Sequence, residues 1–261
     1  MSFIYRVIKA PLDVIITLIC WIYFLFGYLF FYIPLLIVLN PFTSDKESLF
    51  QKINHVFYKV FFMLLKIITP GLSLDISPEV MQIKSAVVVA NHRSYLDPIL
   101  LISLFPRHRT IVKGIFFTIP IMRWIMKSGG YIPFAQSSES REIMREGIQG
   151  MSHFFQKGGV LFIFPEGRRS RDGALGHFQK GAFSIAAQCR MPVEVLYINN
   201  SDTLFTPGKF FFNTCLKNRI TVERVGRIDP DDTGHSHIQA RIMRDKALQL
   251  IQHRIDKKPD N

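Results

Sequence analysis

An uncharged apolar run near the start of the chain sets the first limit on its fold. No Asp, Glu, Lys or Arg occurs from Val14 to Leu39, a longer stretch than the roughly 20 residues that a helix needs to cross a bilayer core. The run therefore predicts a membrane segment. It is too long for a cleaved signal peptide, and no small-residue cleavage site follows it. Gly27 and Pro34 can bend a helix, so a tilted single span and a hairpin that enters and returns both stay open.

A second helix is expected after a polar connector at residues 40–52. Residues of about 55–69 place apolar side chains at helical spacing, with Lys59 and Lys66 on a common side. Such a helix lies among lipid headgroups or packs on the rest of the chain, and its wide apolar face favours the headgroups. We therefore expect membrane-anchoring helices over residues 1–70, with the apolar span at about 14–39, and an α/β domain ending in an amphipathic helix over residues 71–261.

The stretch SAVVVANHRSYLDPILL, residues 85–101, predicts a strand, a turn and a helix. Its consecutive valines suit a buried strand, and Ser94 with Asp97 resembles a helix-capping arrangement. His92 is then expected at the carboxyl end of the strand, where α/β proteins usually bind ligands. A carboxylate within hydrogen-bond reach orients an imidazole, so His92 and Asp97 form a candidate general-base pair. The alternative is a capping aspartate beside an incidental loop histidine.

The stretch GGVLFIFPEGRRSRDG, residues 158–173, follows the same plan. Residues 160–164 predict a buried strand that Pro165 ends, and the arginine-rich segment 166–171 comes directly after it. Guanidinium groups beside a glycine at the end of a strand suit phosphate oxygens, although a solvated turn is the alternative. A helix is expected over residues 177–188 with Lys180 near its start, where the positive end of the helix dipole would add to the same anion site.

The charge of the chain points to an anionic partner. The formal net charge is +12 over 261 residues, which nucleic acid, an anionic membrane or a phosphate-bearing substrate would complement. No nucleic-acid recognition motif is visible, and the basic residues between 98 and 138 alternate with apolar ones, as at a lipid contact. His235 and His237 are the one close histidine pair and the three cysteines are dispersed, so we expect no metal site.

Two motifs in a fixed order carry a family resemblance. NHRSYLD, residues 91–97, and FPEGRRSR, residues 164–171, behind a membrane segment, resemble the glycerolipid acyltransferases, and within them the 1-acylglycerol-3-phosphate acyltransferases. The similarity covers roughly residues 50–200. It implies a mixed central sheet flanked by helices and an O-acyltransferase that needs no cofactor. The implied reaction moves an acyl group from acyl-CoA or acyl carrier protein to the free hydroxyl of lysophosphatidic acid and gives phosphatidic acid for phospholipid biosynthesis, with another lysophospholipid or lyso-lipid acceptor as the alternative.

The resemblance also implies roles for single residues. His92 would remove the proton from the acceptor hydroxyl and later protonate the departing thiolate, while Asp97 would hold the imidazole ring. Binding of the acceptor phosphate would fall to residues in and between the motifs and just beyond them, namely Lys113, Glu166, Gly167, Arg168, Arg169 and Lys180.

The chain departs from the family pattern at three places. Arg168 stands where a threonine is common, which adds a positive charge to the expected acceptor site. Ala135 and Gln136 follow the strand after which the family usually has an acidic and a basic residue. That basic residue is commonly an arginine, and we expect Arg168 to bind the phosphate in its place. Val195 replaces a second proline, which we expect to matter for structure only.

The expected location is a membrane, with the catalytic domain on its cytoplasmic face. The resemblance points to the inner membrane of a bacterium. Membrane lipids, the lysophospholipid acceptor and the acyl donor are the expected partners, and nucleic acid is not. Two other readings remain. A hydrolase centred on Ser94 lacks a nucleophile elbow around the serine. A non-enzymatic, membrane-anchored protein that binds anions or nucleic acid would also explain the charge.

Overall fold

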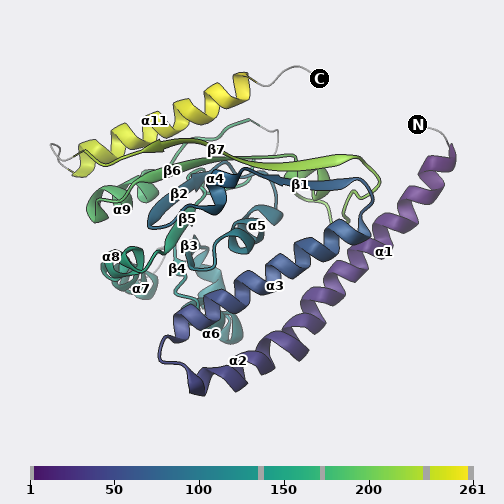
Figure 1. Cartoon of the computed structure of the whole chain (residues 1–261), viewed down its shortest axis with the longest axis horizontal. Coiled ribbons are helices and arrows are strands. Elements are labelled where there is room, and N and C mark those ends of the chain that lie inside the picture. Colours follow the sequence, from purple (N-terminus) through teal and green to yellow (C-terminus); the bar gives the residue numbers. More distant parts are fainter. Residues whose placement is uncertain (1–2, 135–137, 171–173, 232–235, 258–261) are drawn as a thin grey trace. The chain divides into compact units, whose positions relative to one another are not determined.

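The computed structural model describes residues 3–134, 138–170, 174–231 and 236–257 (Figure 1). The chain divides into two compact units, each built from several segments. The first unit contains Met1–Ser77, Arg93–Pro106 and Ile198–Val222. The second unit contains Pro78–His92, Arg107–Tyr197 and Glu223–Asn261. The first unit therefore holds residues from well beyond position 70, and the domain boundary expected there stays a prediction.

One seven-stranded sheet runs through the fold in the order β1-β7-β6-β2-β5-β3-β4. Parallel pairing joins β2 to both β5 and β6, β3 to both β4 and β5, and β1 to β7. All five residues of β2 are buried, as expected for a central strand of a parallel sheet that is covered on both faces. The strands are β1 (Leu72–Ile76), β2 (Ala86–Ala90), β3 (His108–Val112), β4 (Ile132–Pro133), β5 (Val160–Ile163), β6 (Val193–Asn199) and β7 (Asn218–Ile228).

Strand β7 makes the sheet mixed, because it runs opposite to β6. In the second unit Glu194, near the start of β6, pairs with Arg224 in the second half of β7. In the first unit Asn200, directly after β6, donates a hydrogen bond to the carbonyl of Arg219 at the start of β7. The mixed sheet with flanking helices that the sequence predicts is thereby confirmed. Residues 205–217, which precede β7, form a loop.

In the second unit, the core lies between the sheet and two helices. Helix α9 (Gly181–Cys189) packs on β2 and on α11 (Ser236–Asp256), and a hydrophobic cluster joins them through side chains such as Phe183 and Ile251. The ion pair between Arg254 and Glu223 ties α11 to β7. Two helices separated at Gly150 cover residues 138–156. The other helices of this unit are α4 (Pro78–Met81), η3 (Gly114–Phe117), α6 (Pro120–Ser128), α7 (Ser138–Gln149) and α8 (Met151–Gln156).

In the first unit, two long helical segments pack as an antiparallel hairpin. The first is α1 (Phe3–Gly27), a π-helical turn η1 (Tyr28–Tyr32), α2 (Ile33–Leu39) and η2 (Asn40–Phe42), and the second is α3 (Lys46–Ile68). Tyrosine hydroxyls join them, because Tyr23 donates to the carbonyl of Phe57 and Tyr32 donates to Asn54. This unit also contains α5 (Leu96–Leu104) and α10 (Ser201–Leu204).

The hairpin bears on one open alternative and corrects one expected boundary. The apolar run does not return on itself within residues 14–39, since helical structure continues to Phe42 and the chain turns only at residues 43–45. The second helix begins at Lys46 rather than near residue 55, because the Asp45 side chain accepts a hydrogen bond from the Ser48 N–H and caps it. Residues Ile8–Phe42 are long and apolar enough to cross a membrane, and only 22% of their most apolar window is buried.

Candidate active site

His92 lies at the carboxyl end of β2 and is held there by the segment that follows β5. Its N–H donates to the Glu166 carboxylate over 2.9 Å, and its carbonyl accepts from the Ser170 N–H over 2.9 Å. Its imidazole stacks on the Phe164 ring, with 4.2 Å between ring centroids. Parallel pairing of β2 with β5 explains the meeting, because it brings the carboxyl ends of both strands to one edge of the sheet. Two motifs more than seventy residues apart thus share one site in the second unit.

Glu166 joins two backbone segments through its carboxylate. One oxygen accepts from His92, and the other accepts from the Gly176 N–H over 2.9 Å. The side chain is only 8% exposed, so water competes little for these bonds. Gly167 follows with a φ of +68°, and its N–H donates to the Phe164 carbonyl. A residue with a β-carbon would be strained at that φ, which is the physical need for glycine here.

The remaining residues of the expected phosphate site lie around this turn in the second unit. Arg168 is exposed and Arg169 is half-buried. Lys180 occupies the N-cap position of α9, directly after Gln179, whose N–H donates to the Pro165 carbonyl over 2.7 Å. Strand β3 pairs with β5, so the carboxyl ends of these two strands lie side by side. Lys113, which is exposed, follows β3 directly. The backbone positions of these four candidate cations therefore lie at the edge of the sheet where β3 and β5 end. Arg171, Ala135 and Gln136 lie outside the described residues.

Asp97 lies in the first turn of α5, in the first unit, and its side chain is fully buried. Its Oδ2 accepts hydrogen bonds of 2.7 Å from the backbone N–H groups of both Arg93 and Ser94. The carboxylate therefore fixes the turn between β2 and α5, as the capping arrangement predicts. The negative charge is also favoured at the positive end of the helix dipole.

The environment of Ser94 argues against its use as a nucleophile. Its side chain is fully buried, and its hydroxyl donates to the Phe205 carbonyl over 2.8 Å. The same oxygen accepts from the Leu96 N–H. A hydroxyl that is committed to the fold in this way is a structural group, which weakens the hydrolase alternative.

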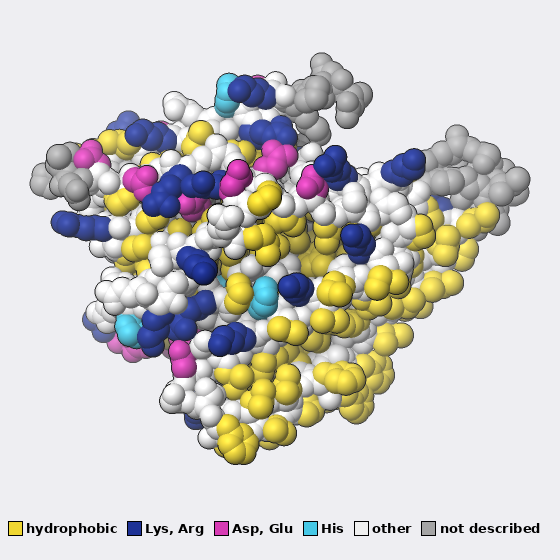
Figure 2. All heavy atoms as spheres, in the orientation of Figure 1, with side chains coloured by type: hydrophobic (Ala, Val, Ile, Leu, Met, Phe, Trp, Pro, Cys, Tyr) yellow, Lys and Arg dark blue, Asp and Glu magenta, His cyan; other side chains and the backbone are white. Residues whose placement is uncertain are grey.

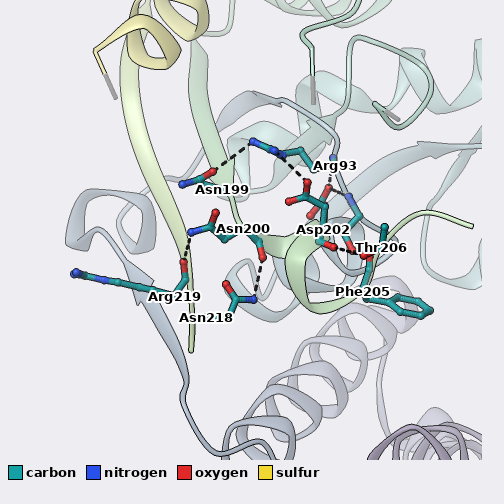
Figure 3. A network of polar contacts seen from close by, with 10 residues as sticks. Arg93, Asn199, Asn200, Asp202, Phe205, Thr206, Asn218 and Arg219 are labelled. Atoms are coloured by element: carbon teal, nitrogen blue, oxygen red, sulfur yellow. Dashed lines mark hydrogen bonds and ion pairs between the residues drawn. The ribbon is translucent and has the colours of Figure 1, made fainter. Parts of the chain in front are cut away.

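Arg93 is a residue whose importance the sequence does not reveal. Its guanidinium donates to the Asp202 carboxylate over 3.1 Å and to the Asn199 side chain over 3.4 Å (Figure 3). Asp202 lies on α10, and its carbonyl accepts from the Thr206 hydroxyl. The residue after His92 in the chain is thus tied to the segment that follows β6. No local pattern predicts this contact, since Arg93 and Asp202 are 109 positions apart.

The turn after β6 is itself fixed in the first unit. Asn200 adopts a φ of +61°, which asparagine tolerates better than most residues. Its side chain donates to the Arg219 carbonyl, and its own carbonyl accepts from the Asn218 side chain (Figure 3). Arg219 in turn pairs with Asp75 on β1. These bonds fix the turn that lies between Asn199 and Asp202, the two partners of Arg93.

The arrangement brings an imidazole to the edge of the sheet where arginine and lysine residues also lie. Imidazole groups can serve as general acids and bases, and arginine and lysine side chains can bind phosphate. Among the described residues, no group of three His, Cys, Asp or Glu side chains is placed to hold a metal ion.

Comparison with known proteins places the segment that contains both motifs in a class of proteins. Residues 75–199 match the family model described as Acyltransferase, a range that contains both motifs. The chain therefore contains a domain of the acyltransferase family. Among its relatives are 1-acyl-sn-glycerol-3-phosphate acyltransferases from several organisms.

Two curated relatives give the extent of the similarity. The chloroplastic 1-acyl-sn-glycerol-3-phosphate acyltransferase LPAT1 of Arabidopsis thaliana is 31% identical over 183 residues, which is 68% of this chain and 50% of that protein. The 1-acyl-sn-glycerol-3-phosphate acyltransferase of Saccharomyces cerevisiae is 32% identical over 182 residues, 67% of this chain and 58% of that protein. The chain spans about half the length of the curated relatives it matches.

A solved structure shares the fold. The crystal structure of the 1-acyl-sn-glycerophosphate (LPA) acyltransferase PlsC from Thermotoga maritima aligns with a TM-score of 0.70 at 20% identity. The alignment covers 97% of this chain and 99% of that one, so the common fold extends over the helices and strands of both described units.

Proposed function

We propose that this chain transfers an acyl group from a thioester donor, acyl-CoA or acyl carrier protein, to the free hydroxyl of lysophosphatidic acid and releases phosphatidic acid. The observation that carries the proposal is the hydrogen bond from the His92 N–H to Glu166. It brings the histidine motif and the arginine-rich turn to one edge of the sheet, as a reaction next to a phosphate requires. The relatives named above support the same substrate class.

In the proposed mechanism His92 is the general base. It takes the proton of the acceptor hydroxyl as the oxygen attacks the thioester carbonyl, and it returns that proton to the thiolate when the carbon–sulfur bond breaks. A positioned base of this kind contributes about 10²–10⁴-fold to the rate. Asp97 would be its partner and stabilise the imidazolium, a role that rests on the His-x4-Asp spacing. Neither step needs a cofactor.

Phosphate binding falls to Arg169 first, with Arg168, Lys113 and Lys180 around it. The half-buried position of Arg169 suits a bidentate contact with phosphate, because a partly dehydrated guanidinium forms stronger charge-assisted bonds. Glu166 and Gly167 would shape the turn that presents these cations. Arg168 supplies a charge where the family pattern has a neutral residue.

The apolar helix supports action at a membrane, where the lysophospholipid is found. The proposed site of the reaction is the cytoplasmic side of a membrane, namely the inner membrane of a bacterium, because the donors acyl-CoA and acyl carrier protein are both water-soluble. Holding both amphiphiles at one surface would supply the remaining rate enhancement through proximity.

The test is a donor-by-acceptor matrix with purified protein. Acyl-CoA and acyl carrier protein are each offered against lysophosphatidate, glycerol 3-phosphate and lysophospholipids with larger headgroups. We expect transfer to lysophosphatidate and its loss in His92→Ala, while His253→Ala, an exposed histidine on α11, keeps wild-type activity. Transfer by His92→Ala at the wild-type rate would refute the assigned base. Transfer to another acceptor alone would change the substrate, and no transfer at all would favour a binding protein.

Arg169→Ala separates binding from chemistry. Loss of a charge-assisted contact with a phosphate that does not react should raise the KM for lysophosphatidate by about 10- to 100-fold and leave kcat nearly unchanged. Arg141→Ala, an exposed arginine on α7, is the matched control. An unchanged KM would place the phosphate elsewhere.

A further inference from the structure

The loop between α10 and β7 carries aromatic side chains that the catalytic proposal does not use. Phe210 is 57% exposed and Phe211 is 49% exposed. Both lie in the aromatic loop, which we define as Lys209–Thr214, in the first unit. Exposed neighbouring phenylalanines are costly in water, so this pair calls for a partner.

The aromatic loop is fastened to one face of α1. The Phe212 N–H donates to the Thr17 hydroxyl over 2.9 Å, and the Thr214 N–H and hydroxyl donate to Asp13 over 2.8 and 2.7 Å. Trp21, one turn further along the same face, stacks on Phe210 with 5.7 Å between centroids and 11° between ring planes. Positions 13, 17 and 21 share a face because they are four residues apart. The exposed phenylalanines are therefore held in a defined place.

Bonding within this contact also hides the polar groups of α1. Asp13 and Thr17 are buried, and Lys9 pairs with Asp13. Behind the exposed pair, Phe212 is buried and stacks on Phe205 with 4.5 Å between centroids. The loop thus turns a helix face that carries a carboxylate into one that presents aromatic rings.

Exposed apolar side chains continue beyond Trp21 along the helix hairpin. Figure 2 shows hydrophobic side chains gathered over α1, α2 and α3. Beyond Trp21, which is itself 45% exposed, the exposed large side chains of the first helical segment are Ile22, Leu25, Phe26, Leu29, Phe30, Phe31, Leu35, Ile37, Val38 and Phe42. Lys209 precedes the exposed phenylalanines and Lys217 follows the loop, and both are exposed.

We infer that the aromatic loop is a second membrane contact, which places Phe210, Phe211 and Trp21 at the boundary between headgroups and acyl chains of an anionic bilayer. Tryptophan and other aromatic rings favour that boundary, and flanking lysines match its phosphate groups. The hydrogen bonds to Asp13 and Thr17 fix the loop to α1, so the loop sets how deeply the helix inserts. This inference requires membrane association but no particular reaction.

Depth-dependent fluorescence quenching tests the inference in the full chain. Trp21→Phe and Trp124→Phe remove both native tryptophans, and Phe210→Trp then places the single reporter in the loop. The protein is reconstituted in vesicles of equal parts phosphatidylcholine and phosphatidylglycerol that contain lipid brominated near the top or near the end of its acyl chains. We expect strong quenching, and stronger quenching by the upper bromines.

Helix α11 offers a control of matched exposure, since Ile238 is 56% exposed and lies in the second unit. In the same background Ile238→Trp should be quenched weakly. Quenching of the loop reporter no stronger than this control would overturn the inference. A blue-shifted loop emission without bromine quenching would also overturn it, because it would place the loop against protein, such as a second copy of the chain.

A partition measurement supplies a second readout. Phe210→Ser with Phe211→Ser should lower binding to the same vesicles by about 10- to 30-fold, as expected for two half-buried phenylalanine rings. Ile238→Ser with Ile242→Ser is the control, with residues that are 56% and 47% exposed. Equal binding by both double variants would contradict the loop contact.

Discussion

Glu166→Gln tests whether the carboxylate of the arginine-rich turn holds His92, the proposed base, or binds substrate. In the structure its two oxygens accept the N–H groups of His92 and Gly176, each over 2.9 Å. Glutamine keeps the shape but offers one acceptor oxygen, so its NH2 group faces the other N–H. One buried N–H then loses its partner, and the remaining bond loses its charge assistance. Together these losses should lower the free energy of unfolding by about 2–4 kcal/mol.

The kinetic consequence distinguishes the two roles. If Glu166 fixes the backbone of His92, kcat should fall about 10²-fold, since small displacements of a reacting group are costly, and the KM for lysophosphatidate should change little. If Glu166 instead orders the acceptor site, KM should rise and kcat should persist. Steady-state kinetics with both substrates varied separate these outcomes, and a thermal melt checks folding.

The chain offers a matched control for the same substitution. Glu223 on β7 also bonds through both oxygens, in its case to Arg254 on α11. Glu223→Gln should reduce stability modestly, because that pair is partly exposed, and should leave kcat unchanged. A Glu166→Gln protein with kcat within twofold of wild type, or a Glu223→Gln protein with an equal loss of kcat, would refute the reasoning.

Two further predictions follow from the first unit. Arg93→Gln and Asp202→Asn should each lower kcat about tenfold without raising the acceptor KM. The kcat of the double variant should be no lower than that of either single variant, because both substitutions break the same contact. Additive losses of kcat in a double-mutant cycle would contradict this. Burial lowers the pKa of His55, whose Nδ1 lies 3.1 Å from the Ile102 carbonyl. In the unfolded chain His55 takes up a proton as the pH falls through its ordinary pKa of about 6.5, whereas in the folded chain it does so only at lower pH. The free energy of unfolding should therefore be at its full value above that pH and decrease below it. Thermal melts from neutral pH downward should show a shallower loss in His55→Asn, and identical slopes would exclude His55 as the cause.

The strands were the most predictable part of the fold. The valine run after Ser85 and residues 160–164 were expected as strands, and they appear as β2 and β5. Both are buried along their length, so their apolar runs carry a strong signal. The start of α3 was wrong although Asp45 supplied a capping signal, because the polar residues 46–52 were assigned to a connector. Asp45 at the N-cap position and Glu47 in the first turn indicate the true start of the helix.

The candidate site was predictable only where chemistry sits within one short segment. His92 and Glu166 each stand out beside a buried strand, and parallel pairing of those strands brings them together. The pairing of Arg93 with Asp202 could not be predicted, because it depends on where α10 lies after folding. The contact of the aromatic loop with α1 was also missed, because Phe212 and its partner Thr17 are 195 positions apart in the chain.

The position of Glu166 in the chain explains why acceptor geometry would be set by the backbone more than by arginine side chains. Glu166 precedes Gly167 and Arg168 directly, and its carboxylate binds the N–H of His92. The separation between the proposed base and the start of the phosphate-binding turn is therefore fixed by one buried side chain and a glycine with φ of +68°. In the proposed substrate the reacting hydroxyl and the phosphate are also a fixed number of bonds apart. Substitutions of the exposed Arg168 should then alter affinity, whereas substitutions of Glu166 should alter the alignment of hydroxyl and base, and so the rate of the chemical step.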